Sequence, residues 1–208
     1  MTRHRTTTIA IAVSLTMLAL AGCTPPAPEP TQSSTPTPTA TPTPSADAPP
    51  KQEPVETPAD MAAAIAGAST AYTGFLAASL DLKKNPSLGA DYLAGYVLEG
   101  STAWTVAVDT IRLNQENGIT VSGGPFEWAL NETMSYTAPS KNPSTGEEIE
   151  NGSAVLFGCV DNTAVDITGA ELPKGSFPVQ VQLVFIPDEA AWIVQSEEYM
   201  TGEGAPLC

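Results

Sequence analysis

A single carboxylate interrupts an apolar pattern and is the first candidate for chemistry. The even positions of one segment read Phe126, Trp128, Leu130, Glu132, Met134 and Tyr136. Because side chains alternate between the two faces of a strand, a strand here would turn Glu132 toward an apolar interior. Burial raises the pKa of a carboxyl group, and such a group can transfer protons. The sequence therefore predicts a pocket formed by Tyr96, Trp104, Trp128, Glu132 and Tyr136.

The same residues could instead have purely structural roles. A β-bulge in this strand would turn Glu132 to solvent, where it is a surface residue or pairs with Arg112. The tryptophan and tyrosine side chains would then belong to the core. No second residue completes a catalytic arrangement with Glu132, so the sequence assigns no catalytic residue.

The scarcity of histidine excludes several kinds of site. His4 is the only histidine, so neither a Ser-His-Asp nor a Cys-His arrangement is available in the folded domain. Ordinary zinc sites also need more ligands than two cysteines without histidine. Asp161 and Asp166 hint at a calcium loop, but the glycine and the distal glutamate of such a loop are missing. We expect turn caps there, and no metal or cofactor.

The first 22 residues have the features of an export signal. Arg3 and Arg5 precede an apolar run of about 13 residues, which is too short to span a bilayer core of about 30 Å. Leu20-Ala21-Gly22-Cys23 resembles the lipobox of bacterial lipoproteins. This resemblance implies a leader at 1–22, acylation of Cys23, and anchoring on the outer face of the cytoplasmic membrane, toward the cell wall. Two or more acyl chains hold a protein stably at a membrane, whereas one does not. An ordinary signal peptide with a coincidental cysteine is the alternative.

The segment that follows, 23–56, has the composition of a disordered tether. Residues 24–57 contain 11 prolines and 11 serines and threonines, and no aromatic residue. Such a segment cannot bury a core, and in polyproline II conformation it would reach roughly 100 Å. We interpret it as a spacer; a ligand for a proline-binding domain is the alternative.

The charge balance argues against nucleic acid as a partner. The chain has 8 Lys and Arg, 23 Asp and Glu, and a net charge of −15. Loss of Arg3 and Arg5 with the leader would leave 6 cations against 23 anions, a net charge of −17. Nucleic-acid binding requires clustered cations, and so strong a negative charge also repels anionic lipids. The acyl anchor is therefore the expected contact with the membrane.

Residues 57–208 contain the folded domain. Thr57-Pro58 predicts a helix start, and Ile65, Tyr72 and Phe75 continue at helical spacing. We expect further helices at 91–98 and from Ser101 to Asn117-Gly118. Beyond these, period-two patterns predict strands at 126–136, 154–160, 178–186 and 191–199, with a long loop at 139–151. Helices followed by an antiparallel meander make an α+β domain, with N-terminal helices packed on a curved sheet.

Two cysteines remain in this domain after acylation of Cys23. Cys159 and Cys208 of an exported domain predict a disulfide, although a free thiol is possible. Closing a loop of about 50 residues would stabilise the domain by roughly 4 kcal/mol on the chain-entropy model.

The order of elements resembles the cone-shaped nuclear-transport-factor-like domains related to ketosteroid isomerases. The details shared with actinobacterial lipoproteins of this kind are the lipobox, the tether, Gly123-Gly124, Cys159-Val160-Asp161, the strand Trp192-Ile193-Val194 and the final Cys208. This resemblance implies a cone that holds a small apolar ligand, or an assembly module for a cell-envelope protein. Two alternatives remain: an enzyme that transfers protons with a carboxylate and a tyrosine, and a purely structural lipoprotein.

Overall fold

The computed structural model describes residues 50–202 and 204–208. The predicted leader, the acylation of Cys23 and most of the tether lie outside the described residues. The described residues belong to one compact unit.

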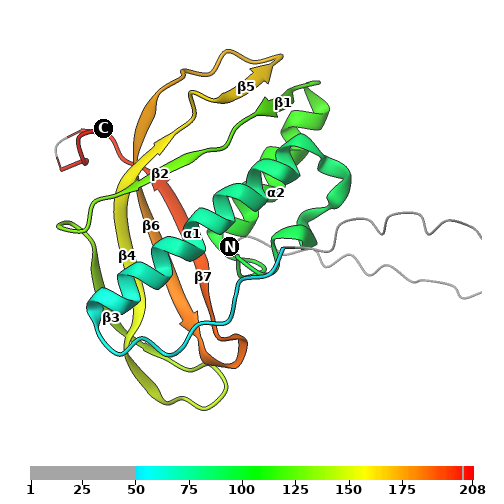
Figure 1. The fold of residues 1–208 in the computed structure, drawn as a ribbon. Helices are drawn as coiled ribbons and strands as arrows, with labels where there is room; N and C mark the ends of the chain where they lie inside the picture. The colour runs from blue at the N-terminus through cyan, green and yellow to red at the C-terminus, as the bar shows by residue number, and fades with distance from the viewer. Residues whose placement is uncertain (1–49, 203) are drawn as a thin grey trace, which may run out of the picture. The chain divides into compact units, whose positions relative to one another are not determined.

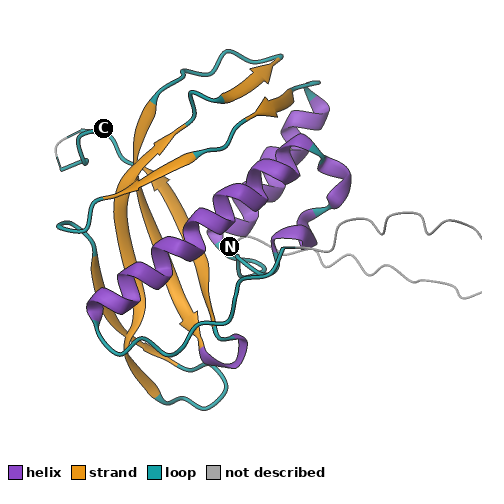
Figure 2. Ribbon diagram, in the orientation of Figure 1, coloured by secondary structure: helices purple, strands orange, loops and turns teal. Residues whose placement is uncertain are grey.

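In the described part of the chain, two α-helices precede seven strands (Figures 1 and 2). The helices are α1 (Met61–Lys84) and α2 (Thr102–Glu116), and single 3₁₀ turns lie at Pro86–Leu88, Ala90–Leu93 and Pro187–Glu189. The strands are β1 (Thr120–Gly123), β2 (Glu127–Leu130), β3 (Tyr136–Lys141), β4 (Glu148–Asp161), β5 (Val165–Thr168), β6 (Ser176–Ile186) and β7 (Ala191–Tyr199).

The strands form two open antiparallel sheets. The larger has the order β2-β4-β6-β7, with β3 also paired to β4 beyond the end of β2. The smaller contains β1 and β5. α1 crosses the large sheet, and the β1-β5 ribbon lies near the C-terminal end of this helix (Figure 1). The predicted α+β class is confirmed, and the described sheets do not close into a barrel.

α1 is stabilised by an N-cap and by a face of small residues against which aromatic side chains pack. The Asp60 carboxylate accepts a hydrogen bond from the amide of Ala63 at 2.8 Å and begins the helix. Gly67 and Gly74 face the core, where Trp192 and Tyr96 occupy the space that a Cβ atom would need. Length and composition alone would allow α1 to cross a membrane, but its apolar face packs inside the domain.

The core lies between α1 and the large sheet. Alternate residues of β6, from Val179 to Phe185, are buried, and Val181 lies opposite Leu156 of β4. Trp192 is fully buried and its ring centroid lies 5.6 Å from that of Phe185. Removing this apolar area from water is the main stabilising contribution to the domain.

Several predicted boundaries are wrong for identifiable reasons. Asp60, not Thr57, caps α1, and the helix predicted at 91–98 is only a 3₁₀ turn. The strand predicted at 126–136 is two strands, β2 and β3, because a turn interrupts it at 131–134. The loop predicted at 139–151 is a β-hairpin with its turn after Lys141, and the short strands β1 and β5 were not predicted. In contrast, Ser101 caps α2, Asn117-Gly118 ends it, and β7 has the predicted bounds.

The end of the predicted tether packs on the domain. The Gln52 side-chain amide donates to the carbonyls of Gly95 and Trp192 at 2.8 and 2.7 Å. The Val55 amide donates to the Ala190 carbonyl at 2.7 Å. The folded unit thus includes residues that precede the predicted boundary at 57.

Candidate functional site

A cavity of about 460 Å³ lies between the two helices, the β1-β5 ribbon and the end of β7. Its wall is mainly apolar and includes Phe75, Val121, Phe126 and Val165. Ordinary binding sites for small molecules are apolar cavities of this size with a few placed polar groups. The cavity is therefore the candidate site.

Glu197 brings a carboxylate to this wall, and an irregularity in β7 explains why. The pairing of β6 with β7 shifts between Gln182 and Leu183, so that Leu183 lies opposite Val194 and Val181 lies opposite Glu197. One extra residue in β7 reverses the alternation of its side chains. Both Val194 and Glu197 therefore face the helices, although they are three residues apart.

Lys83 brings an amine to the same cavity from the last turn of α1. It follows Phe75 and Ser79 at a spacing of four residues, so all three line the cavity from one helix face. The Lys83 ammonium lies 5.1 Å from the centroid of the Phe126 ring. Within the described part of the chain it forms no salt bridge.

Burial moves both groups toward their neutral forms. It lowers the pKa of Lys83 and raises the pKa of Glu197, while the attraction between the two charges opposes both shifts. The half-buried side chains interact electrostatically, yet they are too far apart for an ion pair. Both side chains line the same cavity.

A tyrosine hydroxyl lies beside Glu197. Tyr72 is fully buried, and its hydroxyl has no hydrogen bond of ordinary length within the described residues. Burial first, and then the negative charge of Glu197, raises the pKa of Tyr72 well above its ordinary value. Tyr72 thus remains a neutral hydrogen-bond donor near the carboxylate.

The predicted pocket residues do not come together at this cavity. Trp128 is part of the structural framework, because its indole N–H donates to the Ser69 hydroxyl at 2.9 Å and its ring stacks edge-on against Tyr72. Tyr96 is buried against Gly74, and burial raises its pKa. Trp104 lines a separate hollow of about 240 Å³ near Ile193.

The two remaining predicted residues lie on the surface. Glu132 is exposed in the turn between β2 and β3, so its predicted position inside the cone is wrong. Tyr136 is 49% exposed and packs beside Phe157. Arg112 pairs with Asp109 and Glu116 of its own helix rather than with Glu132.

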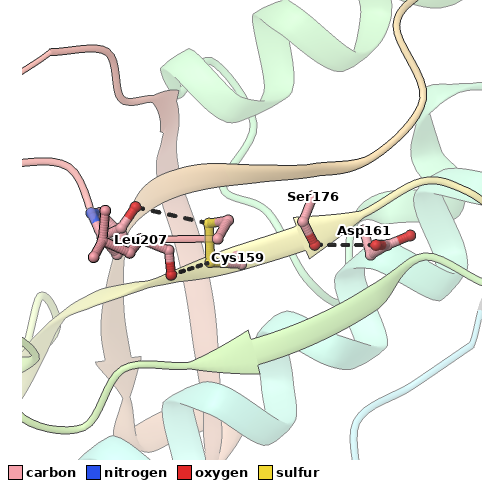
Figure 3. The surroundings of a disulfide bond; sticks show 6 residues. Cys159, Asp161, Ser176 and Leu207 are labelled. Atoms are coloured by element: carbon pink, nitrogen blue, oxygen red, sulfur yellow. Dashed lines mark hydrogen bonds between the residues drawn. A yellow bond between two sulfur atoms is a disulfide. The ribbon is translucent and has the colours of Figure 1, made fainter.

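Cys159 and Cys208 form a disulfide, with their Cα atoms 5.8 Å apart (Figure 3). Val160 is in the core and the Trp128 ring lies against Gly158, so Cys159 between them points to the opposite face of β4. Further along that strand, the Asp161 carboxylate accepts a hydrogen bond from the Ser176 hydroxyl at 3.0 Å. The disulfide thus fastens the C-terminus to the side of the sheet away from the cavity.

Asp161 and Asp166 have structural partners. Two hydrogen bonds from Thr163 hold the pKa of Asp161 below its ordinary value, and Asp166 pairs with Lys174 at 2.7 Å. Within residues 50–202 and 204–208, no three potential metal-ligating side chains of histidine, cysteine, aspartate or glutamate come together.

Comparisons with known proteins give no family. No protein-family model matches the chain, and no curated protein is similar to it. Similar solved structures include the intermembrane space region of the chloroplast protein ARC6, at 8% identity and a TM-score of 0.33, covering 64% of this chain and 97% of that one. Another is a de novo designed β-sheet protein, at 13% identity and a TM-score of 0.31, covering 65% and 91%. Such weak likenesses carry no argument about function.

Proposed function

We propose that this protein is a membrane-anchored, extracytoplasmic lipoprotein whose α+β domain binds a small amphipathic molecule in the cavity between its helices and sheets. One observation carries the proposal: an apolar cavity contains an amine and a carboxylate that form no salt bridge within the described residues. Isolated charges in apolar surroundings are costly unless a partner compensates them. A ligand with an apolar body and a hydrogen-bonding head would supply that partner.

The entrance of the cavity supports an apolar ligand. Val106, Leu172 and Tyr199 line the cavity and are 57, 58 and 65% exposed. They come from α2, the loop after β5, and β7. Large apolar side chains gathered around one opening are typical of a site that an apolar molecule enters.

Anchoring is supported by the lipobox-like Leu20-Ala21-Gly22-Cys23 and by the disulfide, which suits an oxidising compartment. Metabolic labelling with a palmitate analogue tests it. We expect labelled protein in the membrane fraction, and loss of both label and membrane association in Cys23→Ser. An unlabelled wild-type chain would contradict the proposed anchor.

Thermal unfolding of residues 24–208 with octanol tests the cavity. This fragment contains the whole compact domain and needs no detergent, and it is produced in an oxidising compartment. A ligand that binds only the folded state raises its stability by mass action. We expect octanol to raise the unfolding temperature of the wild type, but not of Ala107→Phe, which fills the cavity.

Leu113→Phe on the same helix is the matched control, because Leu113 lies outside the cavity lining. It should retain the octanol response. Equal responses of the two variants, or no response of the wild type, would refute binding at this cavity.

A proton-transfer enzyme is a second candidate, and Glu197 favours it. Burial raises the pKa of Glu197, which lies beside the Tyr72 hydroxyl, whereas Glu132 is exposed in the turn between β2 and β3. Exchange of deuterium into methyl hexyl ketone would report proton abstraction next to its carbonyl. We expect Glu197→Gln to abolish any such exchange and Glu132→Gln to preserve it. The candidate fails if the wild type exchanges no faster than buffer.

A further inference from the structure

The amine of Lys83 differs from the amines of the other described lysines in its burial and in its partners. Lys51, Lys84 and Lys141 are exposed, and Lys174 is held by Asp166. Lys83 is half-buried, lines the apolar cavity, and lies over the face of Phe126. It has neither a salt bridge nor a hydrogen bond within the described residues, so its nitrogen is free to meet a molecule in the cavity.

Burial also makes this amine a better nucleophile. Only the neutral form of an amine has a lone pair that can attack, and the lowered pKa of Lys83 increases the share of that form at neutral pH. Desolvation in an apolar cavity is a common way in which proteins activate lysines.

Glu197 is placed to exchange protons with whatever binds to Lys83. It lines the same cavity and interacts electrostatically with the amine without forming an ion pair. A carboxyl group in that position can protonate a leaving hydroxyl and can accept a proton from nitrogen.

We propose that Lys83 captures an apolar aldehyde or ketone as a Schiff base within this cavity, with Glu197 as the proton donor and acceptor. The inference rests on the proposed function, because the carbonyl compound is then one class of the amphipathic ligand.

The step balances without any further reactant. As the neutral Lys83 nitrogen forms a bond to the carbonyl carbon, the Glu197 carboxyl group donates its proton to the carbonyl oxygen, and the resulting carboxylate accepts a proton from the nitrogen to give a neutral carbinolamine. Glu197 then donates this proton to the hydroxyl, which leaves as water while a carbon–nitrogen double bond forms, so that a protonated Schiff base remains beside the Glu197 carboxylate. The apolar wall disfavours the reverse hydrolysis by limiting access of water.

Reductive trapping with octanal tests the inference. Residues 24–208 are incubated with octanal and sodium cyanoborohydride, which reduces a Schiff base to a stable secondary amine. Peptide mapping then gives the labelling rate of each lysine. We expect Lys83 to be labelled roughly tenfold faster than Lys84, because binding of the octyl chain holds the aldehyde beside the amine.

The neighbouring lysine is the matched control. Lys83→Met should remove the fast labelling, whereas Lys84→Met should leave it unchanged. Glu197→Gln should slow labelling at Lys83, because the amide cannot donate or accept the proton that the step requires. Equal rates at Lys83 and Lys84 would overturn the inference.

Stabilisation by octanol and trapping with octanal together distinguish this inference from the proposed function. If octanol stabilises the domain but octanal labels Lys83 no faster than Lys84, the Schiff base is refuted and ligand binding stands. If octanol has no effect and Lys83 is not favoured, both are refuted. Fast labelling of Lys83 that Ala107→Phe does not slow would overturn capture inside the cavity.

Discussion

At the scale of single residues, Lys83 and Glu197 are two groups whose burial reduces the stability of the fold. Each charge is half-buried in an apolar wall, and burial disfavours the charged form of both. A salt bridge would compensate part of this cost, but the described residues provide none for Lys83. Residues that reduce stability without an internal compensation are typical of binding and catalytic sites.

The pH dependence of stability should reveal Glu197. Its pKa is raised above the ordinary value of 4.5 in the folded state, so the native protein binds more protons than the unfolded chain just above pH 4.5. The stability that this carboxyl contributes is fully present below pH 4.5 and is lost as the pH rises through the folded pKa. Lys83 and Tyr72 act on Glu197, and Glu197 in turn acts on Tyr199. Burial raises the pKa of both tyrosines, so they stay neutral in this range, while the lowered pKa of Lys83 weakens its attraction for the Glu197 carboxylate as the pH rises.

Urea unfolding of wild type and Glu197→Gln between pH 4 and pH 8 measures this effect. We expect the variant to gain stability relative to the wild type as the pH rises, by on the order of 1 kcal/mol. Glu132→Gln, at the exposed turn, should show no such trend. A constant difference between wild type and Glu197→Gln across this range would contradict the raised pKa.

Alternation in the sequence indicates Glu132 as an interior carboxylate, whereas the carboxylate in the cavity wall is Glu197. Simple alternation points to Glu132 and places Glu197 on the face opposite Trp192 and Val194. Both inferences fail where the strand becomes irregular: a turn follows Leu130, and a bulge lies between Val194 and Glu197. Such irregularities depend on pairing with strands that are distant in sequence, and no local pattern records them.

At the scale of elements, close packing of α1 depends on its glycines. An alanine at an exposed helix position is more stable than a glycine by about 1 kcal/mol. At Gly74, however, a Cβ atom would lie 2.6 Å from the Tyr96 ring. Tyr96 is buried, and its carbonyl accepts a hydrogen bond from Val194, which leaves the ring little freedom to move.

We therefore expect Gly74→Ala to destabilise the domain by about 1–3 kcal/mol, because overpacking outweighs helix propensity. Ala77→Gly, at an exposed position of the same helix, is the control and should cost about 1 kcal/mol through propensity alone. Denaturant unfolding compares the two. A stabilised Gly74→Ala variant would show that the contact with Tyr96 relaxes easily.

Elements with strong local signals were predictable. The cap at Ser101, the stop at Asn117-Gly118 and the bounds of β7 follow from local chemistry and periodicity. The ribbon of β1 and β5 was not predictable, because each strand has only four residues and pairs across more than forty positions. The start of α1 was misplaced because Thr57 and Asp60 are both good N-caps, and only packing selects between them.

At the scale of the whole molecule, the disulfide and the cavity lie on opposite faces of β4. Cys159 lies on the face of β4 away from the helices, while Lys83 and Glu197 line the cavity between the helices and sheets. The sequence predicts the disulfide because two cysteines remain for an exported domain. Only the folded structure shows that the two cysteines lie on the face of β4 away from the cavity.

This separation gives the last prediction. Cys159→Ser/Cys208→Ser opens a loop with a sequence separation of 49, and the chain-entropy model predicts a loss of roughly 4 kcal/mol in the free energy of unfolding. The C-terminal segment should then exchange its amide hydrogens faster, because Cys208 no longer fastens it to β4. Octanol binding and trapping of octanal at Lys83 should remain at wild-type levels below the unfolding transition. Loss of ligand binding in a variant that is still folded would show that the disulfide also determines the shape of the cavity.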